Sequence, residues 1–317
     1  MDEEISKPES LISRCSLVTG PTGSGKSAYA FEWARSTKAE LVLIDSMTLY
    51  RGMDIGTAKP NLVEQREIPH HMLDLLEMHE DASAGWWLAQ ATKRIDTILR
   101  RGGKVILVGG TALYLQLLFY GLGTAPIQDP VLRQKLETEA ISFGNQFLHQ
   151  RLGGVDPVAA SKIHPNDTRR IIRALEVYEI TGQPISSFQG QWSQKREPLL
   201  PESGNKWICL GWPREELKLR IAKRTEAMLK AGWLQEVQSL AARNTSWGKT
   251  AGQAVGYQLL LSVLQGEISL SVASQRIIEE TSQVAKHQET WFKRWKSLEK
   301  LEGSEVERNL ANGSAIF

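Results

Sequence analysis

The chain has 317 residues, of which 41% are hydrophobic, 23% are charged and 7% are aromatic. This length fits two domains or one enlarged α/β domain, and the composition is that of a globular enzyme, which excludes disordered and fibrous proteins. The 38 Lys and Arg residues nearly balance the 36 Asp and Glu residues, for a formal charge of +2. The overall charge therefore gives no reason to expect a nucleic-acid partner.

We expect neither membrane insertion nor export. The longest apolar runs, at 105–110 and 112–121, are shorter than the ~20 residues that a membrane-spanning helix needs. The first ten residues are acidic and lack the apolar stretch of a signal peptide. Cys15 and Cys209 stand in separate apolar runs, which predicts reduced core thiols in a cytoplasmic protein.

The first 120 residues alternate between runs typical of strands and patterns typical of helices. Strands are predicted at 14–18, 40–44 and 104–108, all largely apolar. Helical patterns follow the first of these strands, cover 83–100 and begin again after Gly110. Because strands buried on both faces lack the alternation of half-exposed ones, this order predicts a parallel sheet covered by helices.

From 123 to 205 the strand-like runs disappear, and helical patterns at 130–143 and 168–180 dominate. Strand character returns at 206–211, amphipathic helices follow to about residue 300, and 303–317 have the composition of a frayed tail. We therefore predict an α/β protein with one sheet-based core, formed by 1–122 and 206–317. The segment 123–205 is predicted to be an all-helical insertion domain.

A glycine-rich stretch lies between the first predicted strand and the first predicted helix. It matches the phosphate-binding pattern G-x-x-x-x-G-K-[ST] and consists of Gly20, Pro21, Thr22, Gly23, Ser24, Gly25, Lys26 and Ser27. In such a loop the backbone amides turn towards phosphate oxygens, the lysine reaches the outer phosphates and the hydroxyl can hold Mg²⁺. The stretch predicts a diphosphate or nucleotide site on a core like that of the P-loop NTPases.

The acid that usually completes a P-loop NTPase is missing. The Walker-B strand of such proteins ends in Asp, whereas the strand at 104–108 is followed by Gly109-Gly110-Thr111. Asp45 instead follows the strand at 40–44 and would lie on the same sheet edge as the phosphate loop. Its carboxylate could be a metal ligand, a catalytic base or the cap of the next segment, and the missing Walker-B acid weakens a kinase assignment.

Longer motifs extend over nearly the whole chain. IDSMTLYRGMDIGTAKP at 44–60 and HPNDTRR at 164–170 are specific, and further motifs stand at 68–75, 107–122, 155–182, 231–237, 253–258 and 285–295. In these motifs and their order the chain resembles the tRNA dimethylallyltransferases, which prenylate adenosine 37 beside the anticodon.

The resemblance implies a P-loop fold that binds the pyrophosphate of dimethylallyl diphosphate instead of transferring a phosphoryl group. It implies transfer of the dimethylallyl group to N6 of adenosine 37 in tRNAs that read codons starting with U, with release of diphosphate. Mg²⁺ would be the cofactor. The partners would be dimethylallyl diphosphate and the anticodon loop of tRNA, and we expect a monomer.

The resemblance also assigns residues. Asp45 matches the family's general base, Thr111 matches a residue close to the acceptor adenine and the diphosphate, and Arg133 matches a substrate contact on the insertion side. Ser282 and His287 replace two arginines that the family usually carries, which puts contacts of that segment in doubt. The residues that match tRNA-contacting stretches are Asp45, Ser46, Met47, Thr48, Thr111, Arg169, Arg170, Ile171, Ile172 and Arg173.

Prenyl transfer requires a base for the adenine amine and positive charge for the leaving diphosphate. The exocyclic amine of adenine is a poor nucleophile because its lone pair is delocalised, so a base such as Asp45 must accept its proton as the bond forms. Charge builds on the leaving diphosphate, where Lys26, the loop amides and Mg²⁺ at Ser27 would stabilise it. The target adenine must also leave its stack to be reached.

The charge is less balanced locally than overall. Between residues 162 and 173 only one acidic residue, Asp167, opposes four basic ones: Lys162, Arg169, Arg170 and Arg173. Two further basic clusters, at 214–249 and 286–300, include four tryptophans, a combination that indicates an RNA surface: Trp233, Trp247, Trp291 and Trp295.

We expect the histidines to have structural roles and not to bind a metal ion. His70 and His71 are adjacent, and adjacent histidines rarely converge on one metal ion. Near His164, we expect Asn166 or Asp167 to cap a helix.

Three other functions remain open. An adenylate isopentenyltransferase would act on a free nucleotide, although the basic insertion argues for a macromolecular acceptor. A small-molecule kinase is favoured only by the phosphate loop. A nucleotide-switched RNA-binding protein would not need Asp45.

Overall fold

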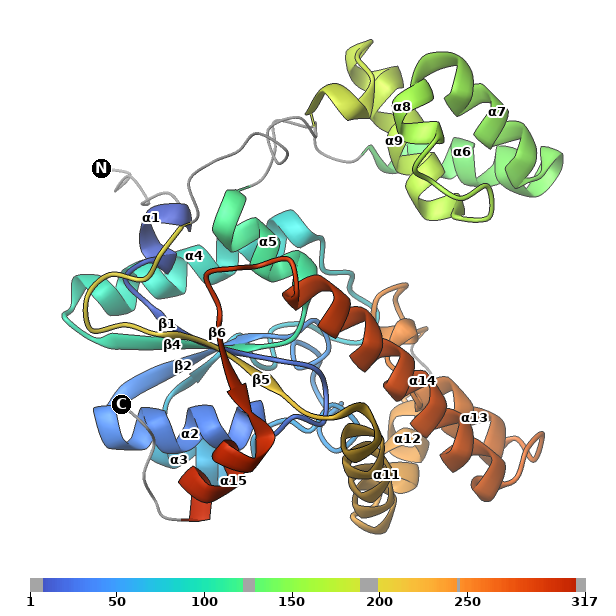
Figure 1. Ribbon diagram of the computed structural model, residues 1–317. Helices are drawn as coiled ribbons and strands as arrows, with labels where there is room; N and C mark the ends of the chain where they lie inside the picture. Colours follow the sequence, from blue (N-terminus) through green and yellow to red (C-terminus); the bar gives the residue numbers. More distant parts are fainter. Residues whose placement is uncertain (1–7, 122–128, 189–198, 244–245, 312–317) are drawn as a thin grey trace. The chain divides into compact units, whose positions relative to one another are not determined.

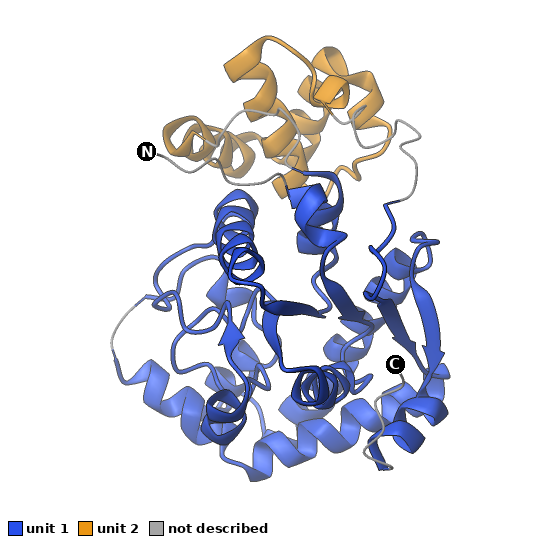
Figure 2. Ribbon diagram, turned by 90° about the vertical axis from the view of Figure 1, so that its left-hand side faces the viewer, with its two compact units in different colours: residues 1–121, 198–317 blue, residues 122–197 orange. Residues whose placement is uncertain are grey.

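The computed structural model describes residues 8–121, 129–188, 199–243 and 246–311. The chain divides into two compact units (Figure 2): unit 1 comprises Met1–Gly121 and Pro198–Phe317, and unit 2 comprises Leu122–Glu197. The chain rejoins unit 1 at Pro198, before the strand at 206–211 that we took as the boundary.

Unit 1 is built on a six-stranded sheet in the order β3-β2-β4-β1-β5-β6, in which neighbouring strands are parallel. The α/β fold class is confirmed, and four strands lie close to their predicted positions. The strands are β1 (Ser16–Thr19), β2 (Ala39–Ile44), β3 (His70–His71), β4 (Lys104–Gly109), β5 (Trp207–Gly211) and β6 (Glu299–Glu302).

Helices cover both faces of this sheet (Figure 1), so β1 and β4 are buried as their apolar sequences require. On one face lie α1 (Pro8–Ile12), α4 (Ala84–Arg100) and α5 (Ala112–Tyr120). On the other face lie α2 (Lys26–Thr37) and α15 (Gly303–Ala311), with α3 (Leu62–Glu67) beside α2. As predicted, α4 begins after Ser83, whose hydroxyl accepts a hydrogen bond from the amide of Trp86.

A layer of helices follows β5 in the chain. It consists of α11 (Arg214–Lys230), α12 (Trp233–Ala241), the 3₁₀ turn η1 (Ala251–Gln253), α13 (Tyr257–Leu264) and α14 (Leu270–Phe292). The long helix α14 packs against both α11 and α13. Between α12 and α13, the buried rings of Trp233 and Tyr257 meet edge to face, with centroids 5.7 Å apart.

The C-terminal segment is ordered up to residue 311, so our prediction of a frayed tail was wrong for 303–311, and residues 312–317 lie outside the described residues. Strand β6 and helix α15 occupy 299–311. Gly303 lies so close to Trp212 that a Cβ would come within 2.1 Å of the indole, Val306 is buried, and Arg220 pairs with Glu307 at 2.7 Å. These contacts with residues far away in the sequence stabilise a segment whose own composition is that of a tail.

The described residues of unit 2 contain helices and no strand, and these helices include α6 (Pro130–Phe143), α7 (Asn145–Val155), α8 (Pro157–Ala160) and α9 (Thr168–Thr181). The predicted helices α6 and α9 are confirmed, and Asp167 caps α9 as expected. The unit has a core of its own, in which Leu136, Leu148 and Leu175 are buried. Within the described part of the chain, no helix is both long and apolar enough to cross a membrane.

Both cysteines are free thiols in unit 1. Cys15, directly before β1, is buried, and Cys209 in β5 is partly buried. Burial raises the pKa of Cys15 to about 12 and that of Cys209 to about 11, so both remain protonated and unreactive at neutral pH.

Candidate active site

The candidate site lies where three neighbouring strands end. In the parallel register Ile44 of β2 lies opposite Gly109 of β4, and Val108 lies opposite Val18 of β1. The segments that follow these strands therefore start side by side at the carboxyl edge of the sheet, which is where open α/β sheets bind ligands. They are the Asp45 loop, the Gly110–Thr111 turn and the phosphate loop.

The phosphate loop folds tightly because its glycines allow it. Gly25 caps α2 with a φ of 87°, in the left-handed region that favours glycine. A Cβ on Gly20, whose φ is 146°, would lie 2.7 Å from the carbonyl oxygen of Leu210. The loop thus packs directly against β5 and leads into the N-terminus of α2, a favourable position for an anion.

Lys26 lies at the base of this loop with its Nζ 3.3 Å from the carbonyl oxygen of Pro21. Burial and the nearby charge of Arg224 lower the pKa of Lys26 to about 8, although Asp45 opposes the shift. The positive charge of Lys26 is costly here without a ligand, and an anion at the loop would stabilise the charged form.

Asp45 is held as the acceptor of a tight turn. Its Oδ1 accepts hydrogen bonds from the amides of Met47, at 2.7 Å, and Thr48, at 3.3 Å. The carboxylate therefore does cap the next segment, one of the three roles left open by the sequence. Its position also makes it available to a ligand, because Asp45 lines two cavities.

Thr111 lies beside Asp45 through the backbone. Its amide donates to the carbonyl oxygen of Ile44 at 3.3 Å, and it stands at the N-cap of α5, where its hydroxyl makes no capping bond. Across the residues that the structure describes, Thr111 does not line either of the cavities that Asp45 lines.

Two residues of the C-terminal helices complete the site, and the sequence had not singled them out. Arg224 of α11 donates from Nη1 to Oγ1 of Thr22 at 3.2 Å. Gln288 of α14 accepts from the amide of Thr22 at 2.8 Å and donates to the carbonyl oxygen of Gly110 at 2.9 Å. Burial lowers the pKa of Arg224 against the opposing charge of Asp45, but an arginine stays protonated at neutral pH.

Two cavities adjoin at these groups. The larger, of about 680 Å³, contains the phosphate loop residues Lys26 and Ser27, and the smaller, of about 140 Å³, is walled by apolar and aromatic side chains such as Met228, Trp233 and Tyr257. Four residues line both cavities: Thr22, Asp45, Thr57 and Arg224. A carboxylate and a guanidinium thus stand where ligands in the two cavities would meet.

Comparisons with known proteins identify the family. The sequence model described as IPP transferase matches residues 48–295. The tRNA dimethylallyltransferase of Geobacter metallireducens is 43% identical over 283 residues, which cover 89% of this chain and 90% of that protein. The chain belongs to the IPP transferase family.

Other similar proteins have names of the same kind. The tRNA dimethylallyltransferase 1 of Trichlorobacter lovleyi is 40% identical over 304 residues, 96% of this chain and 98% of that one. Among solved structures, the full-length tRNA isopentenylpyrophosphate transferase of Bacillus halodurans has a TM-score of 0.65 and 30% identity, with coverage of 95% and 96% of the two chains. A eukaryotic dimethylallyltransferase acting on tRNA has a TM-score of 0.75 and 26% identity, over 93% of this chain and 75% of that chain.

In this member of the IPP transferase family, the expected tRNA contacts of unit 1 lie next to the base candidate. Ser46, Met47 and Thr48 form the turn that Asp45 caps. Met47 lines the smaller cavity and Thr48 the larger one. The buried hydroxyl of Thr48 has no hydrogen-bond partner, so a ligand in the larger cavity could supply one.

Of the residues in unit 2 that we expected to contact tRNA, some are exposed and others are engaged in contacts within the unit. Arg169 and Arg170 are exposed at the start of α9. Ile171 and Ile172 are buried in the helical core, so their side chains pack within the unit and are not available to tRNA. Arg173 pairs at 2.8 Å with the fully buried carboxylate of Glu176, which gives it a structural role.

Arg133 of α6 is less exposed than the arginines at the start of α9. Its side chain is 21% exposed and lies 3.4 Å from the carboxylate of Glu137.

The tryptophans are mostly structural. Trp233 is buried, which contradicts its place in an RNA surface, and Trp295 packs against Phe119 and Phe292. Trp291 is partly exposed with the guanidinium of Arg294 over its ring. His71 contacts Glu40 at 2.7 Å, in agreement with a structural role.

The residues present fit a magnesium ion only if the ligand supplies most of its coordination. Ser27 and Asp45 line the same cavity and offer the oxygen ligands that Mg²⁺ prefers. Across the described residues, no group of three or more His, Cys, Asp or Glu side chains could hold a metal ion. Phosphate oxygens and water would therefore complete the shell, as is usual for Mg²⁺ at phosphate sites.

Proposed function

We propose that the protein transfers the dimethylallyl group of dimethylallyl diphosphate to N6 of adenosine 37 in tRNAs that read codons starting with U, and releases diphosphate. The observation that carries this proposal is the position of Asp45. Its carboxylate lines the cavity of the phosphate loop and the adjoining apolar cavity together with Thr22 and Arg224. A base is thus placed between a diphosphate cradle and a second binding space, which phosphate binding alone would not require.

The reaction forms one N–C bond and breaks one C–O bond. As N6 attacks the allylic carbon, Asp45 accepts the amine proton, and the bonding electrons pass to the bridging oxygen of the diphosphate. Arg224 and Lys26 line the cavity of the phosphate loop, and their positive charges would lower the cost of the charge that develops on this oxygen. Mg²⁺, held by Ser27 and the diphosphate, would neutralise further charge on the leaving group.

The acceptor would be bound through both units. Arg169 and Arg170 on α9 are exposed cations suited to phosphate oxygens of the anticodon stem-loop. Ser46, Met47 and Thr48 stand beside Asp45 and would contact the extruded adenine, whose extrusion costs a few kcal/mol. We propose that the enzyme acts as a monomer in the cytoplasm, where tRNA is used.

A labelling experiment tests this function. The protein is incubated with Mg²⁺, labelled dimethylallyl diphosphate and unmodified tRNA whose anticodon loop has adenosine at position 37. The expected result is label on N6 of that adenosine. Label on AMP, offered as an alternative acceptor, would indicate an adenylate isopentenyltransferase, and label on neither would exclude prenyl transfer. A tRNA with guanosine at position 37 is the matched negative control.

A further inference from the structure

We propose that Lys59 is a positioning residue that fixes Asp45 in place for the proposed prenyl transfer. The inference rests on the proposed function and extends it to a residue outside the phosphate loop and the base. Lys59 belongs to the loop 53–60, which ends the motif at 44–60. This loop supplies Thr57, Ala58 and Lys59 to the wall of the larger cavity.

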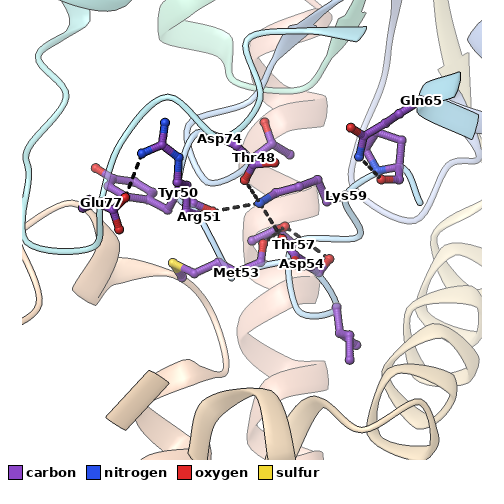
Figure 3. Close-up of polar contacts among 12 residues, drawn as sticks. Thr48, Tyr50, Arg51, Met53, Asp54, Thr57, Lys59, Gln65, Asp74 and Glu77 are labelled. Carbon is purple, nitrogen blue, oxygen red and sulfur yellow. Dashed lines mark hydrogen bonds and ion pairs between the residues drawn. The ribbon is translucent and has the colours of Figure 1, made fainter. Parts of the chain in front are cut away.

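The ammonium group of Lys59 is buried and fully engaged. Its side chain is 2% exposed, and Nζ donates to the carbonyl oxygen of Tyr50 at 2.8 Å and to the carboxylates of Asp54 and Asp74, each at 2.6 Å (Figure 3). An ammonium has three protons to donate. Because all three are used within the protein, Lys59 has none left for a diphosphate, and this distinguishes it from Lys26.

A short chain of hydrogen bonds connects Lys59 to the base. The carboxylate of Asp74 binds Lys59, and the amide of Asp74 donates to the carbonyl oxygen of Thr48 at 3.2 Å. The amide of Thr48 in turn donates to Oδ1 of Asp45 at 3.3 Å. The turn that carries Asp45 is therefore bonded to a segment that Lys59 holds, with two residues between the ammonium and the base.

The backbone around Lys59 needs such an anchor. Asp74 has a φ of 49° and Ala58, next to Lys59, a φ of 50°. Residues other than glycine adopt this left-handed region at a cost, and they remain in it only where surrounding contacts hold them. The bond of Lys59 to Asp74 supplies such a contact at Asp74, and its bond to the carbonyl oxygen of Tyr50 ties the loop to the segment that follows the Asp45 turn.

Lysine suits this place better than arginine. Its three protons point in different directions and reach three acceptors from three segments, whereas the planar guanidinium presents its donors as a fork. Asp54 and Asp74 are 60% and 40% exposed, so water can solvate both carboxylates if the ammonium is removed. A Lys59→Met variant, which keeps an unbranched side chain as far as the ε position and lacks the ammonium, is therefore expected to fold.

Single-turnover transfer tests the positioning role. Lys59→Met is expected to slow transfer about 30-fold or more, because a shift of ~1 Å in a catalytic group costs up to ~10² in rate, while the dissociation constants for tRNA and dimethylallyl diphosphate change less than about threefold. Asp74→Asn retains an acceptor for Lys59 and is expected to stay close to wild type. The exposed residue Lys93 provides the matched control, Lys93→Met.

A double variant separates positioning from general damage. If Lys59 acts through Asp45, then Lys59→Met has no further effect on the residual rate of an Asp45→Asn enzyme. A further slowing of that enzyme by the full factor would overturn the proposal, as would normal rates for Lys59→Met itself.

Hydrogen exchange tests the same coupling without any activity. In Lys59→Met the amides of Thr48 and Asp74 are expected to exchange at least about tenfold faster than in the wild type, while those of α9 stay unchanged. Unchanged exchange at Thr48 and Asp74 would overturn the positioning role. If the wild type transfers no label to tRNA, the proposed function fails on its own, and the exchange result still decides whether Lys59 holds the Asp45 turn.

Discussion

Nη1 of Arg224 donates a hydrogen bond of 3.2 Å to Oγ1 of Thr22, although the two residues are 202 positions apart. Both line the two cavities that meet at Asp45. Arg224 is held against the phosphate loop, where its charge can stabilise the diphosphate as it leaves. This position suits the leaving group better than it suits tRNA binding.

Arg224→Met is therefore expected to lower kcat by ~10²–10³, the usual loss for one donor that stabilises a developing oxyanion, with a smaller change in the KM for tRNA. Steady-state kinetics with both substrates measures this. Lys230→Met, on the same helix and 75% exposed at its side chain, should behave like the wild type. A variant that loses only tRNA affinity would remove Arg224 from the leaving-group site.

Lys26 predicts a pH dependence of diphosphate binding. Its pKa is lowered to about 8, chiefly by burial, so in the free enzyme the charge is present below that pH and is lost above it. Since the anion binds the charged form, affinity for dimethylallyl diphosphate should be level below about pH 8 and fall as the pH rises further. Calorimetry between about pH 7 and pH 10 tests this sign. Lys26→Arg should abolish the fall, and a pH-independent affinity of the wild type would contradict the assignment.

Glu236 of α12 anchors the other end of the Lys59 loop. Its carboxylate accepts from the amides of Asp54, Ile55 and Gly56 at 2.9, 2.7 and 3.3 Å, and from the hydroxyl of Tyr257 at 2.7 Å. Glu236→Gln exchanges one accepting oxygen for an NH₂ group and leaves partly buried donors without a partner. We expect a loss of about 1–3 kcal/mol in the free energy of unfolding.

Urea denaturation measures that loss. Glu226→Gln, whose carboxylate is 66% exposed, serves as the isosteric control and should cost less than ~0.5 kcal/mol. Equal stabilities of the two variants would show that the loop does not depend on Glu236.

The exposed arginines of α9 predict a salt-dependent contribution to tRNA binding. Replacing Arg169 and Arg170 with Gln should weaken binding and reduce the slope of log K against log salt concentration by about one to two units. Lys93→Gln with Lys104→Gln removes the same charge from unit 1, where Lys104 is the first residue of β4, far from the carboxyl edge of the sheet. An unaltered slope in the arginine variant would exclude α9 from the interface.

The sequence predicts best those parts that depend on local pattern. The strands β1, β2 and β4 are largely apolar because both of their faces are buried, and the phosphate loop is specified by its glycines. β6 has the sequence Glu-Lys-Leu-Glu and is largely exposed, so neither an apolar run nor an alternation marks it. Its strand conformation comes from pairing with β5, which no local pattern contains.

The site is predictable only where its residues lie in one motif. Arg224 is one of several cations on α11 and Gln288 one of several polar residues on α14, and only tertiary contacts with Thr22 distinguish them. The reverse holds for Ile171 and Ile172, which were grouped with their arginine neighbours by a contiguous motif. The helical period turns them into the core while Arg169 and Arg170 face outward.

The central claim is that Asp45 accepts the proton of an adenine amine at the junction of the two cavities. Asp45→Asn keeps the Oδ1 acceptor for the amides of Met47 and Thr48 but removes the basic oxygen. Single-turnover transfer of labelled dimethylallyl to adenosine 37 should therefore fall by at least ~10²-fold in this variant, with tRNA affinity nearly unchanged. Transfer at the wild-type rate by Asp45→Asn would contradict the claim.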